Sequence, residues 1–185
     1  HRRLEDVTWL EGRAYAFAQG TPYAPVIDLL TRVGGIDERD DADAVRDKLD
    51  SLAEAAVPGD DEAKLVLRVL FGQAPDEIDL EAFSERLNAA VVRMIDGTAR
   101  RAPTVLCFQD LHWTDPSSAS LIRSIAADAT SPLVLVCNYR PGFQIGIEDV
   151  RALELGELSK RQVTEQLATL LDGEAPPQSL IDLVL

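Results

Sequence analysis

The stretch TVLCFQDLHWTDP, residues 104–116, joins an apolar run to an abrupt group of polar side chains. A continuous apolar run is typical of a strand that is buried on both faces, as in a parallel sheet. Gln109 and Asp110 end the run, which places them at the carboxyl edge of the sheet, where open α/β sheets bind ligands. Asp115 and Pro116 then predict a helix start, with Asp115 as the N-cap and Pro116 at the first helical position.

A second apolar run, PLVLVCN at residues 132–138, predicts another fully buried strand. The strand–helix–strand order implies parallel pairing with a right-handed crossover. Arg140 follows this strand and is therefore expected at the same sheet edge as Asp110. Residues 7–12 and 150–155 predict two further strands, and residues 1–6 are interpreted as the tail of a helix that began earlier.

Apolar residues at helical spacing predict the helices between and after these strands. Gly34-Gly35 and Pro58-Gly59 separate them, and Ser159 is expected as the N-cap of a late helix. The predicted helical segments are residues 26–30, 43–56, 62–71, 80–95, 116–126, 159–171 and 176–185.

The composition of the 185 residues limits the function classes. With 46% apolar residues, the chain can form a core for one domain, or for one domain plus the start of another. The net charge of −14 and the pI near 4.4 disfavour direct contact with nucleic acid, which needs a basic surface. No apolar run reaches the ~20 residues of a membrane span, and no signal peptide opens the chain. Cys107 and Cys137 are expected to be free within core strands, so a cytoplasmic location without a membrane partner is expected.

The segment VLCFQDLHWTDPSSASLIRSI, residues 105–125, resembles the Walker B segment of P-loop NTPases of the STAND and AAA-like kind. In that family, four apolar residues precede two acidic residues, then Leu-His-Trp, a small residue and Asp-Pro-Ser. Three further stretches resemble the same family. They are GRAYAFAQGTPYAPVIDLL at 12–30, LVLVCNYRPGF at 133–143 and LELGELSKRQVTEQLATLL at 153–171. Such modules occur in bacterial LuxR-type regulators and beside class III nucleotide cyclases and kinases.

The resemblance implies a three-layer α/β P-loop NTPase-like fold, a parallel sheet with helices on both faces, plus the start of a helical lid. It implies a core over residues 1–157 and the lid from residues 158–185. The phosphate-binding Walker A loop, Gly-x-x-x-x-Gly-Lys-Ser/Thr, does not occur in these 185 residues. Two explanations stay open: the chain is a fragment that begins after this loop, or the module is degenerate and has lost nucleotide binding.

By resemblance, the first acidic position of the Walker B segment serves the magnesium shell and the second orients or activates water. These positions are Gln109 and Asp110, so both belong to the implied ATP and Mg²⁺ site, with Asp110 as the catalytic residue. A neutral amide cannot offset the charge of Mg²⁺ as a carboxylate does. Gln109 therefore favours slow hydrolysis, a nucleotide switch or binding without turnover. In an alternative register, Asp110 is the magnesium ligand and Asp115 lies nearby.

Arg140 and Asp115 complete the expected nucleotide-binding residues. Arg140 carries bidentate donors that suit a γ-phosphate, and a surface ion pair is the alternative. Asp110 and Asp115 have an alternative as well, as turn and cap residues only.

The function that the resemblance implies is an ATP-binding regulatory module of a larger bacterial signalling or transcription-regulatory protein. ATP hydrolysis is then expected in the full-length protein and not from this chain alone. The implied partners are ATP, an effector domain attached in the same polypeptide, and further copies through self-association. The alternative is an interaction scaffold that keeps the fold without nucleotide.

Overall fold

The computed structural model describes residues 7–73 and 80–184, and the helix tail predicted at residues 1–6 lies outside them. The chain divides into two compact units, residues 1–147 and residues 148–185. The first unit holds the sheet, and the second consists of a loop and short helices.

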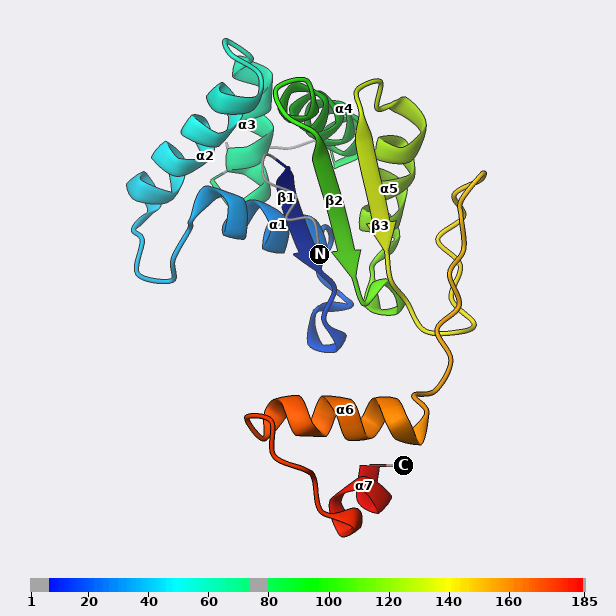
Figure 1. Ribbon diagram of the computed structural model, residues 1–185. Coiled ribbons are helices and arrows are strands. Elements are labelled where there is room, and N and C mark those ends of the chain that lie inside the picture. The colour runs from blue at the N-terminus through cyan, green and yellow to red at the C-terminus, as the bar shows by residue number, and fades with distance from the viewer. Residues whose placement is uncertain (1–6, 74–79, 185) are drawn as a thin grey trace. The chain divides into compact units, whose positions relative to one another are not determined.

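Three parallel strands form the sheet of the first unit, in the order β1-β2-β3 (Figure 1). The strands are β1 (Thr8–Arg13), β2 (Thr104–Gln109) and β3 (Leu133–Cys137). Arg13 is paired with Gln109, and Phe108 with Cys137, so all three strands end at the same edge. The α/β fold class is confirmed, as are the three strands predicted in this unit, within one residue at most ends.

Helices fill the connections between the strands, and each helical segment predicted in this unit is confirmed. Their boundaries differ from the predicted ones by a few residues, because α1 begins before its apolar stretch and α4 runs to Ala99. The helices are α1 (Ala24–Gly34), α2 (Ala42–Ala56), α3 (Asp61–Leu70), α4 (Leu80–Ala99) and α5 (Pro116–Asp128), and the 3₁₀ turns are η1 (Ala16–Ala18) and η2 (Leu111–Trp113).

The predicted start of α5 is confirmed in detail. Asp115 has extended backbone, and its side chain accepts hydrogen bonds from the N–H groups of Ser117 and Ser118, both at 3.0 Å. Pro116 stands at the first helical position, where its missing N–H costs nothing. The carboxylate also accepts the hydroxyl of Ser118 and is buried. Asp115 therefore fixes where the helix after β2 begins.

One face of the sheet carries the hydrophobic core. Leu10, Leu106 and Leu135 lie side by side in the register, and Leu106 is fully buried. The side chains on this face pack with those of α1, α4 and α5, which lie on the same side of the sheet in Figure 1. The largest side chains fully buried in this core include Phe108, Leu49, Leu67, Leu87, Leu106, Leu111, Leu121, Ile122 and Ile125.

Gly12 allows α1 to lie directly against β1. A Cβ atom at this residue would stand 2.3 Å from the backbone oxygen of Pro25, far inside any permitted contact. Only glycine allows this approach, and the same contact holds the turn after β1 close to the carboxyl edge of the sheet.

The opposite face of the sheet is less covered than the sequence predicts. Val134 is 58% exposed and Val136 is also exposed, as is Trp9 on β1. The prediction that residues 132–138 form a fully buried strand is therefore wrong, because β3 is an edge strand and its outer side chains have no covering layer among the described residues. Helices on this second face, and with them the three-layer arrangement, stay a prediction.

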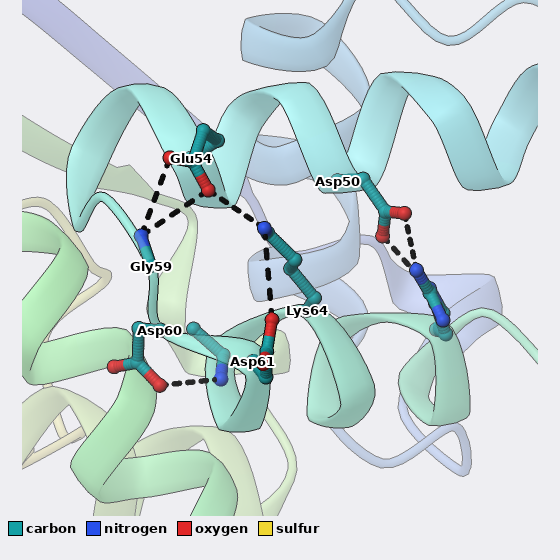
Figure 2. A network of polar contacts seen from close by, with 8 residues as sticks. Asp50, Glu54, Gly59, Asp60, Asp61 and Lys64 are labelled. Atoms are coloured by element: carbon teal, nitrogen blue, oxygen red, sulfur yellow. Dashed lines mark hydrogen bonds and ion pairs between the residues drawn. The ribbon is translucent and has the colours of Figure 1, made fainter.

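Acidic and basic side chains join α2 to α3, at a distance from the sheet (Figure 2). Lys64 donates to Glu54 at 2.6 Å, and this contact holds the pKa of the Glu54 carboxyl below its usual value. Arg68 donates from Nε and Nη2 to the two carboxylate oxygens of Asp50. Asp60 caps α3 by accepting the N–H of Ala63 at 3.0 Å. These three carboxylates thus act as a helix cap and as partners in surface ion pairs.

Asp96 near the end of α4 holds the turn that enters β3. Its carboxylate accepts the N–H and hydroxyl of Thr130, both at 2.9 Å, and the N–H of Ser131 at 3.1 Å. Burial alone would raise the pKa of Asp96, but the hydrogen bonds from Thr130 and Ser131 outweigh burial and hold the pKa below its usual value.

Asp96→Asn is expected to lower the free energy of unfolding by about 1–3 kcal/mol at pH 7, because the charge-assisted hydrogen bonds are lost. Since the pKa is depressed in the folded state, this stabilisation is present above the unfolded value of about 3.9 and disappears as pH falls through the folded value. In urea unfolding at pH 7, 5 and 3, the free energies of unfolding of wild type and variant should converge at the lowest pH. A constant difference between them would contradict this account, and Asp43→Asn, at an exposed carboxylate, is the control.

The second unit contains α6 (Lys160–Leu170) and α7 (Gln178–Val184), which contact each other. Ser159 caps α6 in a capping box with Gln162, as predicted for its N-cap. The strand predicted at residues 150–155 is wrong, because these residues form no strand and Val150, Leu153 and Leu155 are exposed. An alternating apolar segment becomes a strand only beside a neighbour, and no described residue supplies one. Residues 158–185 as a helical lid stay a prediction.

Both cysteines are free, as predicted, and both lie in strands. Burial raises the pKa of Cys107, and it raises the pKa of Cys137 to about 11. Both thiols are therefore protonated at neutral pH and act as small apolar side chains.

Candidate functional site

Asp110 is delivered to the carboxyl edge of the sheet by β2, where the sequence predicts it. Its backbone is left-handed, with φ 56° and ψ 37°, a conformation that aspartate tolerates better than most residues. The N–H of Asp110 donates to Oδ1 of Asn138 at 2.7 Å, and its carbonyl accepts the N–H of Trp113 at 2.9 Å. Uncommon backbone conformations of this kind persist where the surroundings hold them, and they cluster at functional sites. The carboxylate is one-third exposed and open to a ligand.

Arg13 at the end of β1 binds the Asp110 carboxylate directly. Its Nε lies 2.9 Å and its Nη2 lies 2.7 Å from the same oxygen, Oδ2. The two residues are 97 positions apart in sequence, and the parallel register brings them together because Arg13 pairs with Gln109. The only carboxylate that the sequence places at this edge of β2 is thus already neutralised by a cation.

Asp28 on α1 organises the turn from which Arg13 projects. Its carboxylate accepts the backbone N–H of Arg13 at 2.9 Å and Nε of Arg32 at 2.8 Å. The hydroxyl of Tyr15 lies 3.4 Å from the other oxygen and also accepts from Arg32. The hydrogen bond to Asp28 is the main reason why the pKa of Arg32 lies above its ordinary value. The guanidinium of Arg13 lies 5.8 Å from the centre of the Tyr15 ring, which gives it a second, cation–π contact.

The other predicted nucleotide-binding residues occupy different surroundings. Gln109 is the last residue of β2 and is half-buried, and its backbone carbonyl accepts the N–H of Ala14. Arg140 follows β3 at the same edge as Asp110 and is exposed, and no side-chain partner is found for it among the described residues. Asp115 is buried as the cap of α5, with its oxygens occupied by backbone and hydroxyl donors. Roles of these residues toward a nucleotide stay predictions.

The sequence interpretation missed Arg13 and Asn138. Arg13 directly follows the strand predicted at residues 7–12, and Asn138 is the last residue of the strand predicted at residues 132–138. Because the carboxyl ends of parallel strands share one edge, polar residues that follow each strand were detectable as candidates. Their contacts with Asp110 could not be predicted, because the register between two strands that are distant in sequence cannot be inferred from the residues of either strand alone.

The turn η2 buries polar atoms beside Asp110. Both ring nitrogens of His112 and the hydroxyl of Thr114 are buried without a hydrogen-bond partner among the described residues. The ring of His112 contacts Trp113, with 4.8 Å between centroids. Buried polar atoms without hydrogen-bond partners are uncommon in stable folds. The contacts within the fold therefore do not explain why His112 and Thr114 are buried in this turn.

The donor set at the edge fits Mg²⁺ in one respect. Magnesium is held in nucleotide sites by one or two carboxylates together with phosphate oxygens and water, rather than by a full protein cage. Asp110 supplies one exposed carboxylate, and Gln109 supplies an amide oxygen at the neighbouring position. Within residues 7–73 and 80–184, no group of three or more His, Cys, Asp or Glu side chains could hold a metal by itself.

Two cavities lie away from this edge. A shallow hollow of about 570 Å³ lies over the ion pairs of α2 and α3. An apolar cavity of about 240 Å³ lies at the opposite end of β1, between α1, α2 and α4, where Thr8 and Arg101 border it. Neither cavity includes the carboxylate at the end of β2, so the candidate site is defined by the strand ends and not by these hollows.

A parallel sheet with a polar edge after its central strand is the arrangement expected of a P-loop NTPase-like α/β module. The model of the AAA ATPase domain family matches residues 1–136, and the chain belongs to this family of ATP-binding ATPase modules. A part of an uncharacterized protein of Rhizobium meliloti (strain 1021) is 35% identical over 66 residues, which make up 35% of this chain and 6% of that protein. No solved structure matches the chain. In the described part of the chain, no helix has both the length and the apolar character to cross a bilayer.

Proposed function

We propose that this chain is part of an ATP-binding regulatory module of the STAND or AAA-like kind, within a larger bacterial signalling or transcription-regulatory protein. ATP binding with Mg²⁺ switches the conformation of the module and so controls an effector domain in the same polypeptide. The observation that carries the proposal is the partly exposed carboxylate of Asp110, held in a left-handed backbone at the carboxyl edge of the sheet. Membership of the AAA ATPase domain family supports nucleotide binding as the activity.

The residues at the edge have distinct roles in this proposal. Asp110 binds the magnesium or orients the attacking water, Gln109 lies beside it, and Arg140 meets the terminal phosphate. Mg²⁺, when bound, offsets the negative charge that phosphoryl transfer places on the phosphate oxygens. Because Gln109 carries no charge, we expect hydrolysis to be slow and the nucleotide to act as a switch.

Asp115 has a positional role in the proposed site. Its buried carboxylate fixes the first turn of α5 and thus the length of the turn after Asp110. The alternative proposal, a scaffold without nucleotide, is favoured by one observation, the occupation of the Asp110 carboxylate by Arg13.

Binding of ATP by the full natural polypeptide that contains residues 1–185 tests the proposal. We expect magnesium-dependent ATP binding by that polypeptide, and binding at least ten times weaker by residues 1–185 alone. The reason is that these residues contain no Gly-x-x-x-x-Gly-Lys-Ser/Thr loop, whose backbone N–H groups and lysine hold the phosphates. Isothermal titration calorimetry with ATP measures the affinity of the full polypeptide and that of residues 1–185.

Tight ATP binding by residues 1–185 alone would refute the expected dependence on a phosphate loop. A full polypeptide that binds no ATP with or without Mg²⁺ would refute the module and favour the scaffold.

A further inference from the structure

The ion pair between Arg13 and Asp110 occupies Oδ2, one of the two carboxylate oxygens that a metal could use. Nε and Nη2 of Arg13 converge on Oδ2, at 2.9 and 2.7 Å, while the carboxylate remains one-third exposed. A guanidinium keeps its charge at any physiological pH. It therefore cannot release Oδ2 by losing a proton, and a metal reaches this oxygen only when the Arg13 side chain moves away.

Among the described residues, Asp110 is the carboxylate that pairs with the Arg13 side chain. The carboxylate of Asp28 accepts the backbone N–H of Arg13, but its side-chain partners are Arg32 and Tyr15. The ring of Tyr15 lies beside the Arg13 guanidinium and limits where it can go. In the described residues, the position of the Arg13 side chain is thus set by Asp110 and by an aromatic face.

We propose that Arg13 is an internal counter-ion that competes with a divalent cation for Asp110. This inference rests on the proposed function, and of its two roles for Asp110 it takes the one in which Asp110 binds the magnesium. A cation of charge +2 and the guanidinium repel each other at one carboxylate, so the ion pair weakens metal binding there and metal binding weakens the ion pair. Arg13 then keeps the edge neutral until a magnesium nucleotide arrives, and it sets the magnesium concentration at which the switch responds.

The strength of this competition is modest, because the pair is exposed. Arg13 is 47% exposed, and ion pairs of this kind are weak. We therefore expect removal of Arg13 to improve divalent-cation binding at Asp110 by about two- to fivefold. An effect of this size tunes a site without closing it.

Mn²⁺ alone, without nucleotide, tests the competition in residues 1–185. Its paramagnetism broadens the amide signals of nearby residues in NMR spectra, so the Mn²⁺ concentration at half-broadening of the Asp110 amide reports local binding. In Arg13→Gln this midpoint should fall about two- to fivefold. Adding Asp110→Asn to that variant should remove the gain.

Arg46→Gln is the matched control. Arg46 is 45% exposed and paired with Asp43 at 3.0 Å, so the substitution removes the same charge and a similar ion pair at a site on α2. Its Asp110 midpoint should equal that of wild type. If Arg13→Gln fails to fold, as judged from the dispersion of the amide signals, Arg13→Met keeps the aliphatic stem and replaces it.

An unchanged or higher midpoint in Arg13→Gln would overturn the inference, as would an equal fall in Arg46→Gln. The result is separate from ATP binding by the full polypeptide. If ATP binds there but the Mn²⁺ midpoint does not respond to Arg13, only this inference fails. If Mn²⁺ responds as expected but ATP does not bind, the proposed function fails and the competition at Asp110 stands.

Discussion

Phe108→Ala is expected to lower the free energy of unfolding by about 3–5 kcal/mol, the range for removal of a fully buried aromatic side chain. Phe108 lies on the central strand β2 and is fully buried in the core. Its ring lies against Gly12, the residue that allows α1 to approach β1. The substitution therefore opens a cavity where the strand and the helix meet. A loss of this size removes a large part of the 5–15 kcal/mol that a typical domain has.

Urea unfolding of residues 1–185, followed by circular dichroism, measures this loss. Phe17→Ala is the matched control, because Phe17 is the same residue type on η1 and is 89% exposed. The control should change the free energy of unfolding by less than about 0.5 kcal/mol. Equal effects of the two substitutions would show that β2 does not form the centre of the core.

Asp110→Asn is expected to reduce ATP turnover of the full natural polypeptide by about 100-fold or more, the scale for losing a group that acts on the transition state. The substitution keeps the size of the side chain and its place after β2. It removes the negative charge that the proposed mechanism needs at the magnesium or at the attacking water. Phosphate release under saturating ATP measures the effect.

Asp43→Asn makes the same chemical change at an exposed position on α2 and should leave turnover as in wild type. Turnover that survives in Asp110→Asn would remove Asp110 from the mechanism. It would then leave turn geometry as the remaining role of this residue, since its backbone contacts with Asn138 and Trp113 do not need the charge.

The part of the fold that depends on local sequence was predictable. The apolar run of β2 predicts a buried strand from its own residues, and the Asp115-Pro116 pair predicts a capped helix start from its own residues. For the same reason, Gly35 ends α1 in the left-handed conformation that glycine favours.

The surroundings of each strand were not predictable from its own residues. Residues 133–137 are as apolar as residues 104–108, yet Val134 on β3 is exposed while Val105, its register partner on β2, is half-buried. The difference lies in the neighbours, because β2 has a strand on both sides and β3 is at the edge. Residues 150–155 show the same dependence, since their alternating pattern forms no strand without a partner.

In the candidate site, too, features that depend on one strand were predictable and features that depend on two strands were not. Asp110 was predicted at the edge because the end of one strand determines it. Its contact with Arg13 depends on the register of two strands that lie far apart in the sequence. That contact changes the chemistry of the site, because it converts a free carboxylate into one whose charge is already balanced.

The magnesium dependence of ATP binding in the full natural polypeptide, compared between wild type and Asp110→Asn, addresses the role of the β2 carboxylate most directly. Calorimetric titrations with ATP would be made in the presence of Mg²⁺ and of EDTA. If the carboxylate at the end of β2 holds the metal, Mg²⁺ strengthens ATP binding in wild type by about tenfold or more and has little effect in Asp110→Asn, as expected for the loss of a charged metal ligand. The same gain from Mg²⁺ in both proteins would contradict a metal role for Asp110.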